Sequence, residues 1–293
     1  MKAKRVIMHI VCITLAIMVI LPFVLTFTSA TKNRREVSGA YVERLEFLEN
    51  TIIGSVLPSN SFWDNLIILL IDDVGGQAVP LGRAFFNSFI VAAVSVVLAI
   101  YFSSITAYGF VTYRFKGNKA LYGFIIIMMM VPGQISILGY VGLLHAIGLY
   151  DNLFALIIPA VVSPINVFFM RKYMDTTLSL ELVQAGRIDG CSEIGIFHRL
   201  ILPALKPGMA ILALFVAIPS WNSLFLPSLT LRSKDNHTVP MIVNLMNSSK
   251  YTTEMGAVFL VMYLSTLPLI IFYLILHKHI HEAVIHGGLR EEI

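Results

Sequence analysis

Six long apolar runs limit what this chain can fold into more than any other feature of its sequence. A helix that crosses the hydrocarbon core of a bilayer needs about 20 mostly apolar residues, and each run is close to that length. The runs are Val6–Phe27, Phe85–Phe110, Leu121–Leu144, Leu153–Met170, Pro207–Leu226 and Met255–Leu276. Only 13% of the 293 residues are charged, about half the share of a soluble domain. The sequence therefore predicts an all-α, polytopic membrane protein with six transmembrane helices.

The polar segments divide the chain into three predicted parts. We expect residues 1–28 to form an N-terminal tail and the first transmembrane helix, 29–84 an extracytoplasmic loop, and 85–293 a five-helix core. A signal peptide is the alternative for the first run, with Ser29-Ala30 near a cleavage site, but about 20 apolar residues suit a retained span better. In the loop, Phe62–Leu70 is too short to cross a bilayer and carries Trp63. It is predicted to be a helix at the membrane surface or, equally well, a loop helix packed on the bundle.

The basic residues predict the orientation of the spans. Lys2, Lys4 and Arg5 precede the first run. With both termini in the cytoplasm, most of the 21 Lys and Arg residues fall on the cytoplasmic side, as the positive-inside rule expects. These residues stand between apolar runs rather than in one patch, so the net charge of +4 does not indicate a nucleic-acid partner.

A proline interrupts the third run. Pro132 lacks a backbone N–H and its ring clashes with the preceding turn, so a kink or break is expected there. A break of this kind is either a packing feature or part of a transport path. We therefore include Pro132 among the candidate substrate-path residues.

A polar segment between the fourth and fifth runs keeps helical periodicity. Glu181, Gln184, Ala185 and Ile188 fall on one face of a helix. Gly186 and Gly190 lie four residues apart, which would let another surface approach that helix closely. Asp189-Gly190 predicts a turn, and Ser192 with Glu193 the start of a second short helix. With both termini inside, this loop, residues 174–206, is cytoplasmic.

The same loop resembles a motif of a known protein family. The loop reads Gln184-Ala185-Gly186, three residues, Gly190, nine residues and then Leu200-Ile201-Leu202-Pro203. This spacing is similar to the pattern Glu-Ala-Ala, three residues, Gly, nine residues, Ile-x-Leu-Pro. That pattern marks the permease subunits of binding-protein-dependent ABC importers. Most of the chain looks like the carbohydrate-uptake branch, and in particular the smaller maltose-type permease subunit. Gln184 stands where the family has Glu, and Glu181, one turn earlier, is a candidate to supply the charge instead.

The resemblance implies a fold, partners and site residues. The fold is the type I ABC importer permease, in the cytoplasmic (inner) membrane of a prokaryote. The implied partners are a second permease chain, expected to be a different one, two ABC ATPase subunits, an extracytoplasmic solute-binding protein and the lipid bilayer. This chain would bind no cofactor, and ATP and Mg would sit on the ATPase subunits. The ATPase-coupling residues implied are Glu181, Gln184, Ala185, Gly186, Asp189, Gly190, Leu202 and Pro203.

Polar and aromatic residues near the ends of two runs are the remaining candidates for a substrate path. Aromatic rings stack on sugar faces and amides bond to hydroxyl groups, so Trp221 and Asn222, with Asn87 beside Ser88, join Pro132 in this group. The alternative for Trp221 and Asn222 is an interfacial anchor with a hydrogen bond between helices.

Several other functions lack their usual residues. There is no GxxxxGK[ST] phosphate loop, so ATP would have to be bound by another chain. His277 and His281 are four apart and could in principle hold zinc, although a cationic helix end is the simpler explanation, and no metal site is expected. No charged residue lies in the cores of the second to sixth runs, which argues against an ion-coupled transporter. The alternatives are an ATP-independent secondary transporter or channel, a membrane-embedded enzyme, or an ABC importer for an amino acid, peptide or polyamine.

Overall fold

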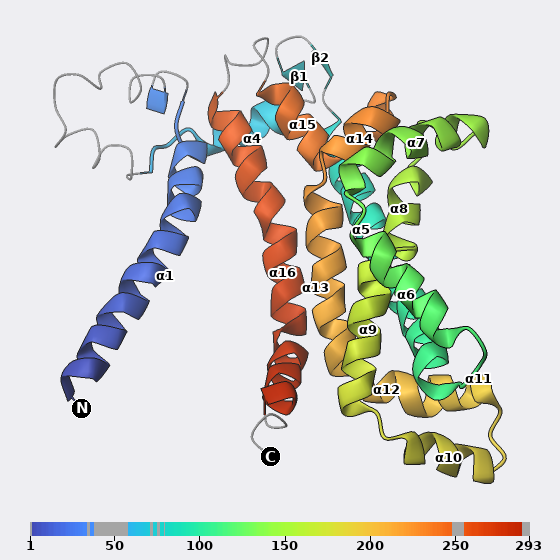
Figure 1. The fold of residues 1–293 in the computed structure, drawn as a ribbon. Helices are drawn as coiled ribbons and strands as arrows, with labels where there is room; N and C mark the ends of the chain where they lie inside the picture. Colours follow the sequence, from blue (N-terminus) through green and yellow to red (C-terminus); the bar gives the residue numbers. More distant parts are fainter. Residues whose placement is uncertain are drawn as a thin grey trace. The chain divides into compact units, whose positions relative to one another are not determined.

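The computed structural model describes residues 2–33, 36–37, 58–70, 73–74, 77–78, 80–247 and 255–288. Much of the predicted 29–84 loop, residues 38–57 included, lies outside them. The elements (Figure 1) are α1 (Lys2–Ala30), α4 (Phe62–Leu70), β1 (Asp73–Val74), β2 (Gln77–Ala78), α5 (Leu81–Thr112), α6 (Asn118–Met129), α7 (Gly133–Ala146), α8 (Phe154–Val161), α9 (Pro164–Thr177), α10 (Leu180–Ile188), α11 (Glu193–Ile196), the π-helical turn η1 (Phe197–Ile201), α12 (Leu202–Ala204), α13 (Lys206–Asn222), α14 (Phe225–Thr230), the 3₁₀ turn η2 (Lys234–Asn236), α15 (Val239–Met246) and α16 (Met255–Gly288). The described chain is thus helical apart from one short antiparallel hairpin, in which Asp73 pairs with Ala78.

Four helices in the described part of the chain are long and apolar enough to cross a membrane. They are Arg5–Ala30, Leu81–Thr112, Phe154–Thr177 and Met255–Ile280. Two bent pairs meet the same criterion, Asn118–Met129 with Gly133–Ala146 and Glu193–Ala204 with Lys206–Asn222. When each bent pair is taken as one span the total is six, which agrees with the predicted all-α polytopic fold.

The third predicted span is broken at Pro132. The helices α6 and α7 on either side of it meet at 99°, and Pro132 itself has the extended backbone of a helix N-cap (φ −61°, ψ 122°). A proline has no N–H to continue the ladder of hydrogen bonds. The predicted break is confirmed, and it is too sharp for Leu121–Leu144 to be one continuous helix.

The other predicted spans also differ in their bounds: α1, α5 and α16 are longer than predicted, and the fourth and fifth spans break or end within the predicted range. The fourth, predicted as Leu153–Met170, divides into α8 and α9 because Ser163 is extended, as a residue before proline prefers. It also continues to Thr177. The fifth was predicted to reach Leu226, but α13 ends at Asn222, where Ser223 leaves the helical conformation.

The chain forms two compact units, Met1–Gly82 with Met241–Pro268, and Arg83–Pro240 with Leu269–Ile293. In the first unit the amide of Asn65 on α4 donates to the carbonyls of Ala30 (2.9 Å) and Lys32 (3.0 Å). These bonds occupy carbonyl groups that the end of α1 leaves unpaired. Gly256 packs directly against the Lys32 carbonyl and the Asn65 amide. The predicted short helix Phe62–Leu70 is therefore packed within this unit, while its Trp63 is 68% exposed.

The second unit has its core where α5, α9 and α13 meet the polar loop. Tyr108, Met174, Phe197 and Leu212 are buried members of this core, and each comes from a different one of these segments. Burial of apolar side chains is the main stabilising contribution to folding. Because the loop supplies part of the buried core, it is an integral part of the folded unit rather than a loose hairpin.

Candidate functional site

The polar loop folds as two short helices joined by a turn, as the sequence predicts. The Ser179 hydroxyl caps α10 by accepting from the Glu181 N–H (3.2 Å), and the Ser192 hydroxyl caps α11 by accepting from the Gly195 N–H (3.2 Å). Between them Gly190 has φ +74°, and the Cys191 N–H donates to the Gly186 carbonyl (3.0 Å). This is the Schellman ending of a helix, in which the left-handed position favours glycine.

The predicted face of α10 is exposed. Glu181, Gln184, Ala185 and Ile188 all face solvent, and Ile188 is 86% exposed. On α11, Ile194 is 73% exposed. Large apolar side chains beside charged groups, on the most polar loop of a membrane protein, are typical of a surface that a partner covers.

The remaining predicted coupling residues are placed as follows. Asp189, Gly190 and Pro203 are exposed, and no atom lies near the position that a Cβ on Gly190 would take. Leu202 is partly buried and packs against the core of the second unit. Three of the four are thus accessible to a partner.

Gly186 does not lie on the exposed surface. It is buried, and a Cβ at this position would come 3.0 Å from Leu200 Cδ1 and 3.1 Å from Ile196 Cγ1. The close approach predicted from the glycine spacing exists, but the surface that approaches is the second helix of the same loop. The prediction that Gly186 offers bare backbone to another protein is therefore wrong.

A carboxylate joins the two helices of the loop to the end of α5. Glu193 Oε1 accepts from Arg187 Nε (2.7 Å), and Oε2 accepts from the hydroxyls of Tyr113 (2.6 Å) and Tyr108 (3.3 Å). The Arg187 hydrogen bond, then that from Tyr113, lowers the pKa of Glu193. Burial, then the bond to Glu193, raises the pKa of Tyr113. Tyr113 therefore stays protonated, and its hydroxyl donates the hydrogen bond to Glu193. We call these four residues the Glu193 junction.

Sequence reasoning missed the Glu193 junction. Glu193 was identified only as a helix start, and the two tyrosines lie about 80 residues earlier. The available signal was two hydroxyl-bearing aromatic residues at the end of a span. Nothing in their spacing indicates which loop they meet.

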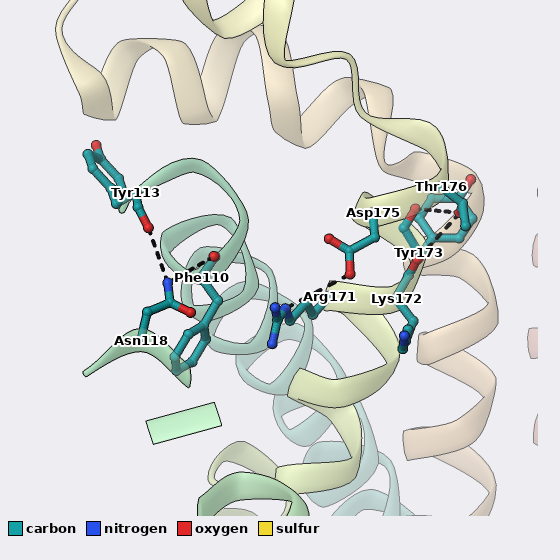
Figure 2. A network of polar contacts seen from close by, with 8 residues as sticks. All are labelled: Phe110, Tyr113, Asn118, Arg171, Lys172, Tyr173, Asp175 and Thr176. Atoms are coloured by element: carbon teal, nitrogen blue, oxygen red, sulfur yellow. Dashed lines mark hydrogen bonds and ion pairs between the residues drawn. The ribbon is translucent and has the colours of Figure 1, made fainter. Parts of the chain in front are cut away.

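An arginine in the middle of α9 packs on α6, and Figure 2 shows it with the turn that follows α5. The Arg171 guanidinium lies 3.5 Å from the centre of the Tyr122 ring, a cation–π contact, and its Nε is 3.9 Å from Asp175. The Asn118 amide donates to the carbonyls of Phe110 and Tyr113, both at 3.1 Å. These contacts fix the turn between α5 and α6 at the point where Tyr113 reaches the loop.

Two cavities of the second unit lie at the helix breaks. One of about 790 Å³ is apolar and is bordered by Val131 and Gly133, the neighbours of Pro132. The other, of about 320 Å³, lies between α8–α9 and α13–α14. Its polar lining residues are Ser163, Asn166, Ser220 and Ser223. Sequence reasoning missed these four, although Ser163 and Ser220 each adjoin a proline that marks a break or kink.

The predicted substrate-path residues do not line the 320 Å³ cavity. Trp221 is 4% exposed and packs on Phe85, with ring centres 6.1 Å apart. Asn222 is exposed. Asn87 is 2% exposed, and its amide donates to the carbonyls of Asp235 (2.7 Å) and His237 (3.0 Å). A role for these residues in solute binding stays a prediction.

A second carboxylate ties two turns together at the other end of this unit. Asp151 has φ +58°, and its carboxylate accepts from the backbone N–H of Arg232 (2.9 Å) and Ser233 (3.1 Å) and from the Ser233 hydroxyl. Its own carbonyl accepts from the Asn236 amide (2.6 Å). Burial by itself would raise the pKa of Asp151, but these hydrogen bonds outweigh it and lower the pKa to about 2. We call this group the Asp151 clamp.

In the part of the chain that the structure describes, no group of three or more His, Cys, Asp or Glu side chains is placed to hold a metal ion. His277 turns its Nδ1 to the Leu274 carbonyl (2.6 Å), and the side chain of His281 lies outside the described part. Cys12 and Cys191 are both free thiols.

Comparisons with known proteins agree on one family. The family model described as "Binding-protein-dependent transport system inner membrane component" matches residues 99–286. The arabinooligosaccharides transport system permease protein AraQ of Bacillus subtilis is 34% identical over 210 residues, covering 70% of this chain and 73% of the relative. The sn-glycerol-3-phosphate transport system permease protein UgpE of Pectobacterium atrosepticum is 27% identical over 271 residues, 92% of each chain.

A solved structure shares the fold. A chain from the crystal structure of a bacterial ABC transporter involved in the import of the acidic polysaccharide alginate superposes with a TM-score of 0.75. It is 20% identical in sequence, and the match covers 95% of this chain and 97% of that one. This likeness supports the architecture described above.

Proposed function

The chain belongs to the inner membrane components of binding-protein-dependent transport systems, and from that premise we propose that it is the permease subunit of an ABC importer that moves a sugar or oligosaccharide inward. The family supplies the permease and not the ATPase. The observation that carries the mechanism is the exposed apolar pair Ile188 and Ile194 on a capped, well-packed loop. Such a pair is stabilised when a partner's groove removes it from water.

In this proposal the loop is the docking site for an ATPase subunit. Glu181, Gln184, Ala185 and Asp189 would surround the apolar pair, with Glu181 supplying the charge absent at Gln184. Two ATPase subunits would close on ATP and Mg, displace the docked loop and so rock the spans that continue from it. This chain would bind neither ATP nor Mg. A second permease chain, expected to be different, and an extracytoplasmic binding protein would complete the transporter in a prokaryotic inner membrane.

We propose the 320 Å³ cavity as part of the solute path. Its three serines and one asparagine offer the hydrogen-bonding groups that sugar hydroxyls need, beside the apolar Phe215. Two relatives are named for arabinooligosaccharide transport, at 34% and 31% identity, which favours a neutral oligosaccharide as cargo. The relatives named for sn-glycerol-3-phosphate keep a small phosphorylated solute as the second candidate.

Docking is tested by affinity purification of the detergent-solubilised complex, with ATPase co-purification as the readout. We expect Ala185→Asp to lose the ATPase, because it places a charge in the apolar contact without disturbing the buried side of α10. Ala120→Asp, at an exposed alanine of α6, is the matched control and should retain it. If no ATPase accompanies the wild type, the importer proposal is wrong and an ATP-independent transporter becomes the leading alternative.

The cargo is tested by uptake into cells that express the whole transporter. Radiolabelled arabinotriose should accumulate and sn-glycerol-3-phosphate should not. Asn166→Ala should reduce arabinotriose uptake with ATPase co-purification unchanged. Uptake of glycerol-3-phosphate alone would overturn the sugar assignment and leave the importer assignment intact.

The orientation is tested with the native thiol of the loop. Cys191 is exposed, and in a Cys12→Ala background it is the chain's sole cysteine. A membrane-impermeant maleimide should label it in inside-out vesicles and not in intact cells. Labelling in intact cells would place the loop outside and contradict ATPase docking.

A further inference from the structure

The Glu193 junction brings together three segments that belong to different parts of the second unit. Arg187 is on α10, Glu193 begins α11, and Tyr108 and Tyr113 lie at the end of α5. One carboxylate accepts from all three donors at 2.7, 2.6 and 3.3 Å. Hydrogen bonds to an ionised group are shorter and stronger than neutral ones, so the first two are the firm contacts.

The loop also rests on α5 through apolar contacts. The Phe197 ring of η1 lies 5.5 Å from the Tyr108 ring and 6.2 Å from the Tyr101 ring, centre to centre. Apolar contact resists separation but has little directional preference. It therefore opposes lifting the loop off α5 more than it opposes sliding the loop along it.

The carboxylate supplies the directional restraint. Oε1 is bonded to α10 and Oε2 to α5, so a slide of α10 relative to α5 must stretch one bond or the other. The rest of α10 packs against its own loop, where Gly186 meets Ile196 and Leu200. Without the carboxylate, the loop keeps a long polar contact to α5, between the Tyr101 hydroxyl and His198 Nε2 (3.4 Å). This contact restrains the loop less, so the two loop helices can move together against α5 while their mutual packing stays intact.

We infer that Glu193 is a positioning residue for transport: it holds the docked loop in register with α5, so that displacement of the loop moves this span instead of being absorbed at the contact. This inference rests on the proposed ATPase docking and extends it from the exposed apolar residues of the loop to the side chains that bond to α5. The residues concerned are distinct from those of the docking face.

The test follows the distance between loop and span in the assembled transporter. Nitroxide labels are placed on native Cys191 and on Ile105→Cys of α5, in a Cys12→Ala background, in proteoliposomes with the ATPase. Double electron–electron resonance is recorded without nucleotide and after trapping with ATP and vanadate. We expect an equally narrow distance distribution in both states for the otherwise wild-type chain. With Glu193→Gln we expect it to broaden about twofold in the trapped state alone.

Two further variants make the result decisive. Tyr113→Phe removes one hydroxyl without changing charge and should broaden the trapped state by a smaller amount. Asp175→Asn breaks the loose ion pair on α9 (3.9 Å) and should leave both distributions unchanged. A trapped-state distribution in Glu193→Gln as narrow as wild type, or broadening that is equal with and without nucleotide, would overturn the inference, because the second result is what a merely structural contact gives.

Failure of the underlying proposal has a different signature. If ATPase docking is wrong, no ATPase co-purifies with the wild type and no vanadate-trapped state forms. If only the role of Glu193 is wrong, the ATPase co-purifies and trapping succeeds, but Glu193→Gln gives either the wild-type distribution or the same broadening with and without nucleotide.

Discussion

In the second unit the Asp151 clamp lies in the turn between α7 and α8, and the Glu193 junction lies at α10 and α11, at the opposite end of the unit (Figure 1). The two ends are held by different means. Asp151 accepts from backbone N–H groups of residues 232 and 233 and occupies a left-handed backbone position itself. Glu193 accepts only from side chains in the contacts described, an arginine and two tyrosines. Both carboxylates have lowered pKa values, so both remain ionised at neutral pH.

The difference lies in what each carboxylate can tolerate. A bond to a backbone N–H fixes the chain itself, and breaking it leaves a main-chain group unpaired. The bonds of Glu193 join side chain to side chain, so they hold the loop to the end of α5 without tying either backbone to the rest of the unit. The Asp151 end is thus fixed through the main chain, whereas at the Glu193 end the loop and α5 can move together. An importer whose motion begins at the loop needs this combination.

The largest effect is expected for Asp151→Ala. The substitution leaves two N–H groups without their acceptor and puts alanine at a positive φ, for a loss of about 2–3 kcal/mol in the free energy of unfolding. Thermal unfolding of the detergent-solubilised protein measures it. Asp151→Asn keeps an acceptor and tolerates the left-handed backbone, so it is the control and should lose less than half as much. Equal losses would show that the charge, and not the backbone contact, makes the clamp.

The second-largest effect is expected when acid protonates the Asp151 carboxylate and weakens the clamp. Its pKa is lowered to about 2 from an ordinary value of about 3.9. The stabilisation is therefore complete above the ordinary value and is lost as the pH falls toward 2. The stability difference between wild type and Asp151→Asn should shrink by about 1 kcal/mol over this range, after allowance for solvent screening. A difference that stays constant down to pH 2 would contradict the assignment.

Gly186→Ala should disturb the loop to a smaller extent. The added methyl meets Leu200 and Ile196 at 3.0–3.1 Å, and overpacking of this size costs about 1 kcal/mol. Hydrogen exchange of the α10 amides should rise. Gly109→Ala, in α5 with no atom within 4 Å of the new Cβ, is the matched control and should change nothing in α10. Unchanged exchange in Gly186→Ala would mean that α10 does not rest on η1 as described.

The smallest effect is expected for Tyr113→Phe. Loss of one hydrogen bond at a half-exposed site should lower the free energy of unfolding by roughly 0.5 kcal/mol, because Arg187 and Tyr108 still donate to Glu193. Thermal unfolding again measures it. A loss as large as that of Asp151→Ala would remove the contrast between the two ends.

Much of the fold was predictable from the sequence because its causes are local. Spans follow from apolar length, the break at Pro132 from a missing N–H, and the turn at Gly190 from a position that only glycine adopts easily. The exposed face of α10 follows from helical periodicity. Gln184, Ala185 and Ile188 needed no tertiary information to be placed correctly.

What the sequence alone determined is therefore a helical membrane protein of recognisable family, with one polar loop built as two capped helices. What the tertiary structure decided is which groups meet across long sequence separations: Glu193 with Tyr108 and Tyr113, Asp151 with Ser233, and the four polar residues of the 320 Å³ cavity. It also turned Gly186 inward onto its own loop. The physical reason is that helix periodicity and capping depend on neighbours within about four residues. The partner of a side chain beyond that range depends on how whole helices pack, which no local pattern encodes.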